Sequence, residues 1–330
     1  MKRFAFILLA LACALPAHAG KRYSYDRVGN TADVAPQTTR GVVLMGGGTE
    51  VDSSMRKLCA WANDGDFLVI RATGTDAYNP YLQDLCPGLN SVATLVIPSK
   101  SAAADQFVAQ TIRAAEAIWI AGGAQDDYIN YWTGTPVQDE LNASISRGVP
   151  IGGTSAGLAV LTQYVYSALG SKGVTSAQAL ADPYNRYITL ASDFVSLPAL
   201  AGVIGDTHFV TRDRMGRALA FLCRIANASW DDAPRAIAVD EGTALEIPAD
   251  GPATVASNAS NGSVYFLSPT EPAQDCAPKV PLTFRNVDVY RVGPNETFDL
   301  VNWAGSGGTR YQVSAVSGTL TSDQAGSSIY

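Results

Sequence analysis

The sequence predicts an α/β protein with a doubly wound, mostly parallel sheet and a β-rich C-terminal part. Up to about residue 170, short apolar runs alternate with segments of helical periodicity, the order that produces parallel sheets. From about residue 236, short strand-like runs follow one another with Gly, Pro and Asn turns between them. There is no Pro-rich linker and no internal repeat. We therefore expect a single domain over residues 40–330, with the late strands added to the same sheet or packed at its edge.

The expected elements of the first half are buried strands separated by amphipathic helices. Strands are expected at Gly41–Met45, Phe67–Arg71, Ala93–Ile97, Ala117–Ala121 and Pro150–Gly152, and helices at Ser53–Ala62, Asp105–Ala115 and Gln138–Arg147. In such sheets, ligands bind at the carboxyl ends of the strands. Gly46–Gly48, Gly122–Gly123 and Ser155 all follow expected strands, so we expect them to converge. Later strands are expected at Ala236–Val239, Ala244–Ile247, Ser263–Leu267, Asp288–Val292 and Tyr311–Val316.

Residues 1–19 have the pattern of a secretory signal peptide. Lys2 and Arg3 precede the apolar run Phe4–Leu15, and Ala17-His18-Ala19 is a small-x-small cleavage site. The apolar run is about a dozen residues long, which is too short for a membrane-spanning helix. The sequence therefore predicts export to the periplasm or the medium without a membrane anchor, and a polar, irregular N-terminal arm over residues 20–39.

Charge and cysteine content limit the partners and the compartment. Removing Lys2 and Arg3 from the 23 basic residues leaves 21 against 30 acidic ones, a net charge near −9. This balance argues against nucleic acid as a partner. Four cysteines remain after the leader, and an even number in an exported chain favours two disulfides. Pairing Cys59 with Cys86 and Cys223 with Cys276 gives the shortest loops, but the other two pairings and free thiols stay open.

The segment Gly153-Thr154-Ser155-Ala156-Gly157 has the Gly-x-Ser-x-Gly pattern of a nucleophile elbow between a strand and a helix. Such a strained turn presents the serine Oγ and places the next backbone N–H near a developing oxyanion. Here that donor would be Ala156, at a helix N-terminus whose dipole favours negative charge. The structural alternative is a tight turn in which Ser155 caps the helix.

His208 is the one histidine left after the leader is removed, because the other is His18. Sites with several histidine metal ligands are thereby excluded, and any histidine base for Ser155 must be His208. Three arginines follow it closely, which suits a site that binds a carboxylate better than a protein core. Asp240-Glu241 follows an expected strand and offers an acid to orient the histidine. The alternative is a buried histidine with a structural role.

Four motifs in this order resemble the cyanophycinases and the related aspartyl dipeptidase-type serine peptidases. They are Gly122-Gly123-Ala124-Gln125, Gly153–Gly157, Asp206–Phe209 with Arg212–Arg217, and Val239–Ala244. The resemblance spans most of residues 41–320 and implies a class I glutamine amidotransferase-like, flavodoxin-like fold. It implies that Ser155 is the nucleophile, His208 the base and Glu241 the orienting acid, with oxyanion N–H groups from Ala156 and Gly123. It also implies a substrate pocket lined by Gln125, Asp206, Thr207, Arg212, Arg214 and Arg217.

The substrate implied by the resemblance is cyanophycin, multi-L-arginyl-poly-L-aspartate, cleaved through an acyl-enzyme to β-Asp-Arg dipeptides without a metal or organic cofactor. Two positions depart from the family pattern: Thr207 stands where Gln is usual, and Ala124 where Asn or Asp is common. Two alternatives therefore stay open, a peptidase or isopeptidase for other aspartyl peptides and a non-catalytic peptide-binding protein. The oligomeric state, a homodimer among the options, is not indicated by the sequence.

Overall fold

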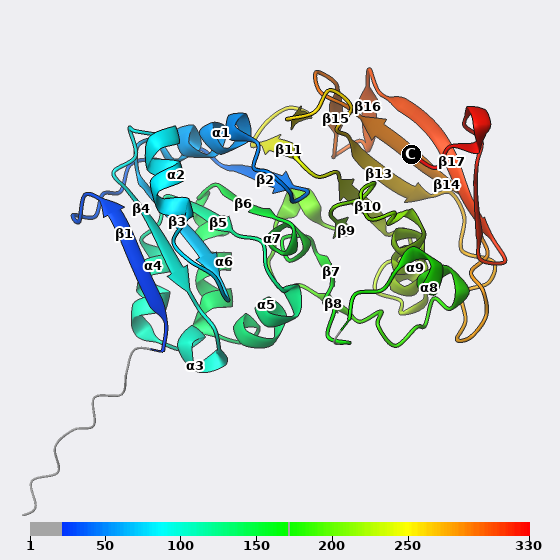
Figure 1. The fold of residues 1–330 in the computed structure, drawn as a ribbon, viewed down its shortest axis with the longest axis horizontal. Coiled ribbons are helices and arrows are strands. Elements are labelled where there is room, and N and C mark those ends of the chain that lie inside the picture. Colours follow the sequence, from blue (N-terminus) through cyan, green and yellow to red (C-terminus); the bar gives the residue numbers. More distant parts are fainter. Residues whose placement is uncertain (1–21, 171) are drawn as a thin grey trace, which may run out of the picture.

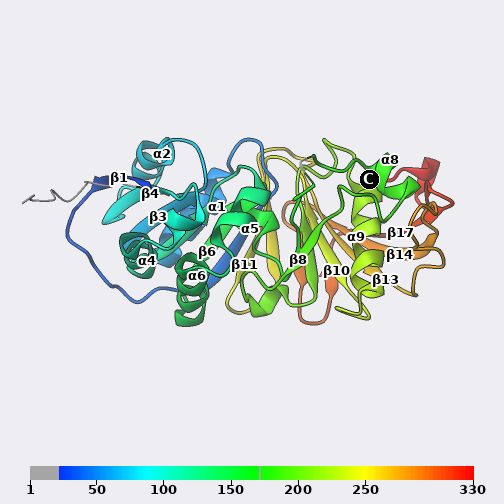
Figure 2. The ribbon, with the colours of Figure 1, turned by 90° about the horizontal axis from the view of Figure 1, so that it is seen from below.

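The computed structural model describes residues 22–170 and 172–330, so the leader predicted at residues 1–19 lies outside the described residues. The described strands form a ten-stranded and an eight-stranded sheet. Figures 1 and 2 both show the two sheets side by side along the long axis of the molecule. One hydrophobic cluster contains residues of both, including Leu44 and Ile118 from the first sheet and Ile237 and Phe266 from the second.

The first sheet has the order β1-β4-β3-β5-β6-β2-β11-β12-β15-β16. Its parallel part consists of β4 (Ser91–Val96), β3 (Asp66–Arg71), β5 (Ala117–Ile120), β6 (Ile151–Thr154) and β2 (Gly41–Met45). Helices α1 (Asp52–Ala62) and α2 (Tyr78–Leu85) pack on one face. The other face is covered by α3 (Lys100–Ala103), α4 (Gln106–Arg113), α5 (Gln125–Trp132) and α6 (Pro136–Arg147). These strands are short apolar runs because helices bury both of their faces.

The second sheet has the order β18-β17-β14-β13-β10-β9-β7-β8. Its strands are β18 (Thr319–Ser322), β17 (Thr309–Val316), β14 (Phe284–Val292), β13 (Val264–Pro269), β10 (Arg235–Val239), β9 (Val203–Asp206), β7 (Tyr164–Tyr166) and β8 (Leu190–Ser192). The strands β7, β9 and β10 are parallel, and the other pairs are antiparallel. Helices α8 (Ser176–Ala181) and α9 (Met215–Asn227) cover one face. Two 3-10 turns lie at Pro198–Leu200 and Ala325–Ser327.

The predicted fold class is confirmed: the protein is α/β with a mostly parallel doubly wound part and a strand-rich C-terminal part. The C-terminal strands are divided between the two sheets. The strands β11 (Thr243–Pro248), β12 (Ala253–Ser257), β15 (Thr297–Asp299) and β16 (Ala304–Ser306) extend the first sheet, and β10, β13, β14, β17 and β18 belong to the second.

The prediction of an irregular arm at residues 20–39 was wrong in part, because β1 (Ser24–Gly29) lies within it and pairs antiparallel with β4. The strand is only partly buried along its length, so its sequence has no continuous apolar run. The shortest-loop disulfide pairing was right: Cys59 is bonded to Cys86 and Cys223 to Cys276. Across residues 22–170 and 172–330, no helix has the length and apolar character needed to span a membrane.

Candidate active site

Ser155 occupies the sharp turn between β6 and the short helix α7 (Ala156–Ala159). Its backbone has φ 52° and ψ −117°, a conformation that non-glycine residues rarely adopt and that surrounding structure must hold. The Ser155 N–H donates to the carbonyl of Met45 at 3.0 Å, which ties the turn to β2. A Cβ at Gly157 would lie 2.7 Å from the carbonyl carbon of Ile120 and closer still to its oxygen. The turn therefore requires glycine at position 157.

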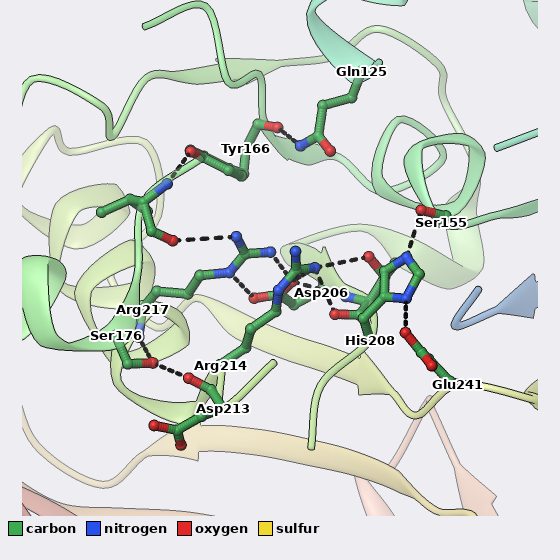
Figure 3. Close-up of polar contacts among 12 residues, drawn as sticks. Gln125, Ser155, Tyr166, Ser176, Asp206, His208, Asp213, Arg214, Arg217 and Glu241 are labelled. Carbon is green, nitrogen blue, oxygen red and sulfur yellow. Dashed lines mark hydrogen bonds and ion pairs between the residues drawn. The ribbon is translucent and has the colours of Figure 1, made fainter. Parts of the chain in front are cut away.

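His208 follows β9, and its imidazole faces Ser155, as Figure 3 shows. Its Nε2 lies 2.7 Å from Ser155 Oγ, and its Nδ1 lies 2.5 Å from Oε1 of Glu241. Glu241 follows β10, which is paired in parallel with β9. The imidazole is buried, whereas 34% of the Glu241 side chain is exposed. The structure thus brings together the three residues that the sequence predicts as nucleophile, base and acid.

The loop Gly46–Gly48 after β2 packs against both the histidine and the glutamate. The His208 N–H donates to the Gly46 carbonyl at 2.8 Å, and the Gly242 N–H donates to the Gly47 carbonyl at 2.8 Å. Gly47 has φ 96°, and a Cβ there would lie 2.5 Å from His208 Nε2. The loop therefore fixes the position of the imidazole, and it converges with Ser155 as the strand-end argument predicts.

The protonation state of His208 suits a general base. Burial lowers the pKa of His208, the hydrogen bond to Glu241 opposes that effect, and the positive charges of Arg212 and Arg214 lower the pKa further. The net effect is a pKa below the usual value for histidine, so the imidazole is neutral at pH 7. With Nδ1–H donated to Glu241, Nε2 is the nitrogen that can accept the Ser155 proton.

The backbone amides of Ala156 and Gly123 are the predicted oxyanion donors. Ala156 directly follows the nucleophile, and a Cβ placed on Gly122, the neighbour of Gly123, would lie 3.6 Å from Ser155 Cβ. Among the described residues, neither the Ala156 nor the Gly123 N–H donates to another group of the chain. Both amides are therefore available to a bound oxygen atom.

Asp206 and Arg217 form a buried ion pair rather than an open pocket surface. Arg217 Nε donates to Asp206 Oδ2 at 2.8 Å, and its Nη2 donates to Oδ1. Arg214 Nη1 lies 3.4 Å from the same Oδ1. Burial would raise the pKa of Asp206, but the charge and hydrogen bonds of Arg217, with Arg214, outweigh it and lower the pKa. Asp206 is thus held as a carboxylate.

Of the remaining residues predicted for the substrate pocket, Arg214, Thr207 and Gln125 form hydrogen bonds within the protein, whereas Arg212 is exposed. Arg214 Nη1 donates to the Thr207 carbonyl at 2.7 Å and to its Oγ1 at 3.1 Å, so the Thr207 hydroxyl already has a partner. Gln125 Nε2 donates to the carbonyl of Tyr166 (Figure 3). Arg212 is exposed, and its side chain has no ion-pair partner among the described residues.

Tyr166 was missed by the sequence analysis, although it links several predicted residues. Its ring lies 5.1 Å from the Arg217 guanidinium carbon, and its carbonyl accepts the bond from Gln125. It comes from β7, a strand of three residues with no motif around it. The pairing of β7 with β9 brings it to the site, and no sequence motif surrounds it.

Comparison with known proteins found a matching family model and similar solved structures. Residues 42–181 match the model of peptidase family S51, a segment that includes Ser155 and ends before His208. A peptidase from an acI-B1 Actinobacterium shares the fold with a TM-score of 0.51 and 15% identity, over 80% of this chain and 98% of that one.

A second solved structure, titled a putative peptidase E protein from Listeria monocytogenes EGD-e, superposes with a TM-score of 0.43 and 12% identity over 67% of this chain and 100% of its own. No curated protein matches the sequence. The likeness to the actinobacterial structure concerns the fold alone, whereas the family match comes from the sequence of residues 42–181. The resemblance predicted from the motifs is thereby confirmed: residues 42–181 match the model of peptidase family S51.

Proposed function

We propose that the protein is an exported serine exopeptidase that hydrolyses cyanophycin to β-Asp-Arg dipeptides through an acyl-enzyme. The observation that carries the proposal is the hydrogen-bonded series from Ser155 Oγ to His208 Nε2 at 2.7 Å and from His208 Nδ1 to Glu241 at 2.5 Å. Relationship to family S51 supports peptides as the substrate class. The two disulfides support an oxidising compartment, as expected after export.

In the proposed mechanism, His208 Nε2 takes the Ser155 hydroxyl proton as Oγ bonds to the scissile carbonyl carbon. The N–H groups of Ala156 and Gly123 stabilise the resulting oxyanion. His208 then gives its proton to the leaving amine as the carbon–nitrogen bond breaks. Water, deprotonated by His208, attacks the acyl-enzyme, and the acid product leaves with Ser155 restored. Glu241 holds the imidazole in the required tautomer and stabilises its charged form.

The positive charge of Arg212 near the base supports a substrate that carries a carboxylate close to the scissile bond. Arg212 is exposed four residues after His208 and is free to meet a carboxylate. In a β-aspartyl peptide the free α-carboxylate carbon lies three bonds from the scissile carbonyl carbon, and in cyanophycin each arginine carries a free carboxylate. The bidentate geometry of a guanidinium suits that group.

A related specificity, for other aspartyl peptides, is the second candidate. The Thr207 hydroxyl accepts a hydrogen bond from Arg214, so it is not presented to substrate as a longer Gln side chain could be. A polar group missing from a pocket changes the preference between substrates by orders of magnitude. Because position 207 departs from the family pattern, several aspartyl peptides should be tested beside cyanophycin.

The proposal is tested by incubating the protein with insoluble cyanophycin and following both turbidity and products by mass spectrometry. We expect clearing and β-Asp-Arg dipeptides with the wild type, and a rate at least roughly 10⁴-fold lower for Ser155→Ala. The exposed Ser53→Ala variant on α1 is the matched control and should retain the wild-type rate. An undiminished rate in Ser155→Ala would refute the nucleophile.

Two further outcomes separate the alternatives. Cleavage of aspartyl dipeptides without clearing of cyanophycin would favour the related peptidase. A serine-reactive probe should label Ser155, and the label should be lost in His208→Ala because the hydroxyl then has no base. Absence of labelling and of every cleavage in a folded protein would favour a peptide-binding protein.

A further inference from the structure

A polar cavity of about 400 Å³ lies at one end of strands β10, β13, β14 and β17 of the second sheet, beside the acid of the triad. Its size falls in the range of about 300–1,000 Å³ that is typical of small-molecule sites. Charged residues Asp240, Arg291 and Glu296 line it together with Tyr265 and Tyr330. Asp240 directly precedes Glu241 in the chain, so the cavity adjoins the triad.

The strand register extends this cavity away from the triad. Ala238 of β10 is paired with Tyr265 of β13, Tyr265 with Arg291 of β14, and Arg291 with Thr309 of β17. Directly paired residues share a face of the sheet, and neighbouring strands are about 4.8 Å apart. Arg291 therefore lies about 10 Å from β10, two strands beyond the one that carries Glu241.

Three aromatic rings pack together at the cavity, and neither Asp206 nor Arg217 lines it. Phe209, next to His208, lies 5.2 Å from the ring of Tyr265 and 5.6 Å from that of Tyr330. The Tyr330 hydroxyl donates to Asp213 Oδ1 at 2.8 Å and accepts the Met215 N–H at 3.0 Å. The cavity is thus a compartment of its own, not part of the arginine cluster predicted from the motifs.

The cavity contains one guanidinium and two carboxylates, and among the described residues they form no ion pair with one another. Arg291 is half-buried and forms no ion pair with any acidic residue among the described parts of the chain. Asp240 accepts N–H bonds from Val210 and Ser263, both at 3.2 Å, and Glu296 accepts one from Gly293 at 2.6 Å. An unpaired guanidinium is suited to a carboxylate, and two carboxylates nearby are suited to a cation.

We propose that this cavity is a subsite for one substrate residue that carries both a carboxylate and a cationic side chain. Arg291 binds the carboxylate, and Asp240 with Glu296 binds the cation. Val210, which is 38% exposed at the cavity, offers an apolar contact for the methylene groups between the two charges. An arginyl residue linked through its α-nitrogen has this combination of groups. The inference rests on the proposed function, because it takes the ligand to be part of the peptide substrate.

The test is calorimetric binding to the Ser155→Ala protein, which requires no turnover. Nα-acetyl-L-arginine carries both charges, its amide lacks the carboxylate, and Nα-acetyl-L-citrulline lacks the cation. We expect the first to bind at least about tenfold more tightly than either analogue. Arg291→Gln should remove the preference for the acid over the amide, and Glu296→Gln should weaken the preference for arginine over citrulline. Arg285→Gln, on an exposed part of the same strand, is the charge-matched control.

The subsite is refuted if acetylarginine does not bind, or binds equally to the parent and to folded Arg291→Gln. These outcomes are distinct from failure of the proposed function. A wild-type protein that cleaves cyanophycin while Arg291→Gln has an unchanged KM would keep the peptidase and remove the subsite. A protein that cleaves no peptide but binds acetylarginine through Arg291 would keep the subsite and remove the peptidase.

Discussion

The imidazole of His208 has neighbours that move its pKa in opposite directions. Burial lowers the pKa, Glu241 raises it, and the arginines at positions 212 and 214 lower it again. Because the base must be neutral, activity is present above the His208 pKa and is lost as the pH falls through it. The arginines near the base therefore act on the pH range of the reaction as well as on substrate binding.

Replacing Arg212 by Gln tests this effect at the residue scale. Arg212 is exposed, so its removal leaves the packing of the site intact while the His208 pKa rises. We expect the acid limb of kcat/KM against pH to move to higher pH. The shift should shrink as salt is added, because exposed charges are screened.

Arg56→Gln, an exposed position on α1, is the control for the loss of one positive charge and should leave the acid limb in place. An acid limb that moves to lower pH, or stays fixed at low salt in Arg212→Gln, would contradict this account of the base.

At the scale of elements, the nucleophile is positioned by the turn between β6 and α7. Ser155 keeps a positive φ because its N–H is bonded to Met45 and because α7 packs closely against the end of β5. That approach is permitted only by the missing side chain at Gly157, which lies against the Ile120 backbone. A backbone neighbour cannot turn aside as a flexible side chain can.

We expect Gly157→Ala to lower the free energy of unfolding by at least about 2 kcal/mol and to lower the cleavage rate roughly 100-fold or more, because the helix must shift away from β5. Gly173→Ala is the control, since a Cβ at Gly173 meets no atom within 4 Å. Thermal unfolding and labelling by a serine-reactive probe measure the two effects. A Gly157→Ala protein with wild-type melting and labelling would show that the turn tolerates a side chain.

At the scale of the whole molecule, the sequence predicts the buried central strands better than the partly buried edge strand and the short polar helices. The strand β2 was predicted with its observed bounds because both faces are buried and its residues form one apolar run. The helix α5 was missed because its first turn carries Asp126 and Asp127 and its apolar face is short. The edge strand β1 was missed because its residues are only partly buried.

The same distinction applies to the site. Ser155, His208 and Glu241 each lie in a local motif, so the sequence alone could name them. Tyr166 reaches the site, and Arg291 the neighbouring cavity, through strand pairing between distant segments. The register of that pairing leaves no mark on the sequence near either residue. Residues whose function depends on register are therefore the ones that sequence reasoning misses.

The two disulfides each stabilise the helical layer beside one sheet. Cys59 of α1 is bonded to Cys86 just after α2, next to the first sheet, and Cys223 of α9 is bonded to Cys276 in the segment between β13 and β14 of the second. The bonds close loops with sequence separations of 27 and 53 residues. Closing such loops removes conformational entropy from the unfolded chain, more for the longer loop.

Removing either disulfide should therefore destabilise the folded protein, and the longer loop should matter slightly more. We expect the free energy of unfolding to fall by about 3.5 kcal/mol in Cys59→Ser/Cys86→Ser and by about 4 kcal/mol in Cys223→Ser/Cys276→Ser. Urea unfolding of the two double variants measures this, and wild type unfolded with and without a reductant is the control.

Thiol titration of the unfolded, non-reduced wild type should detect no free thiol among these four positions. Four free thiols in protein recovered from an oxidising compartment, or unchanged urea midpoints in both variants, would contradict a stabilising role and would remove the support that the disulfides give to export.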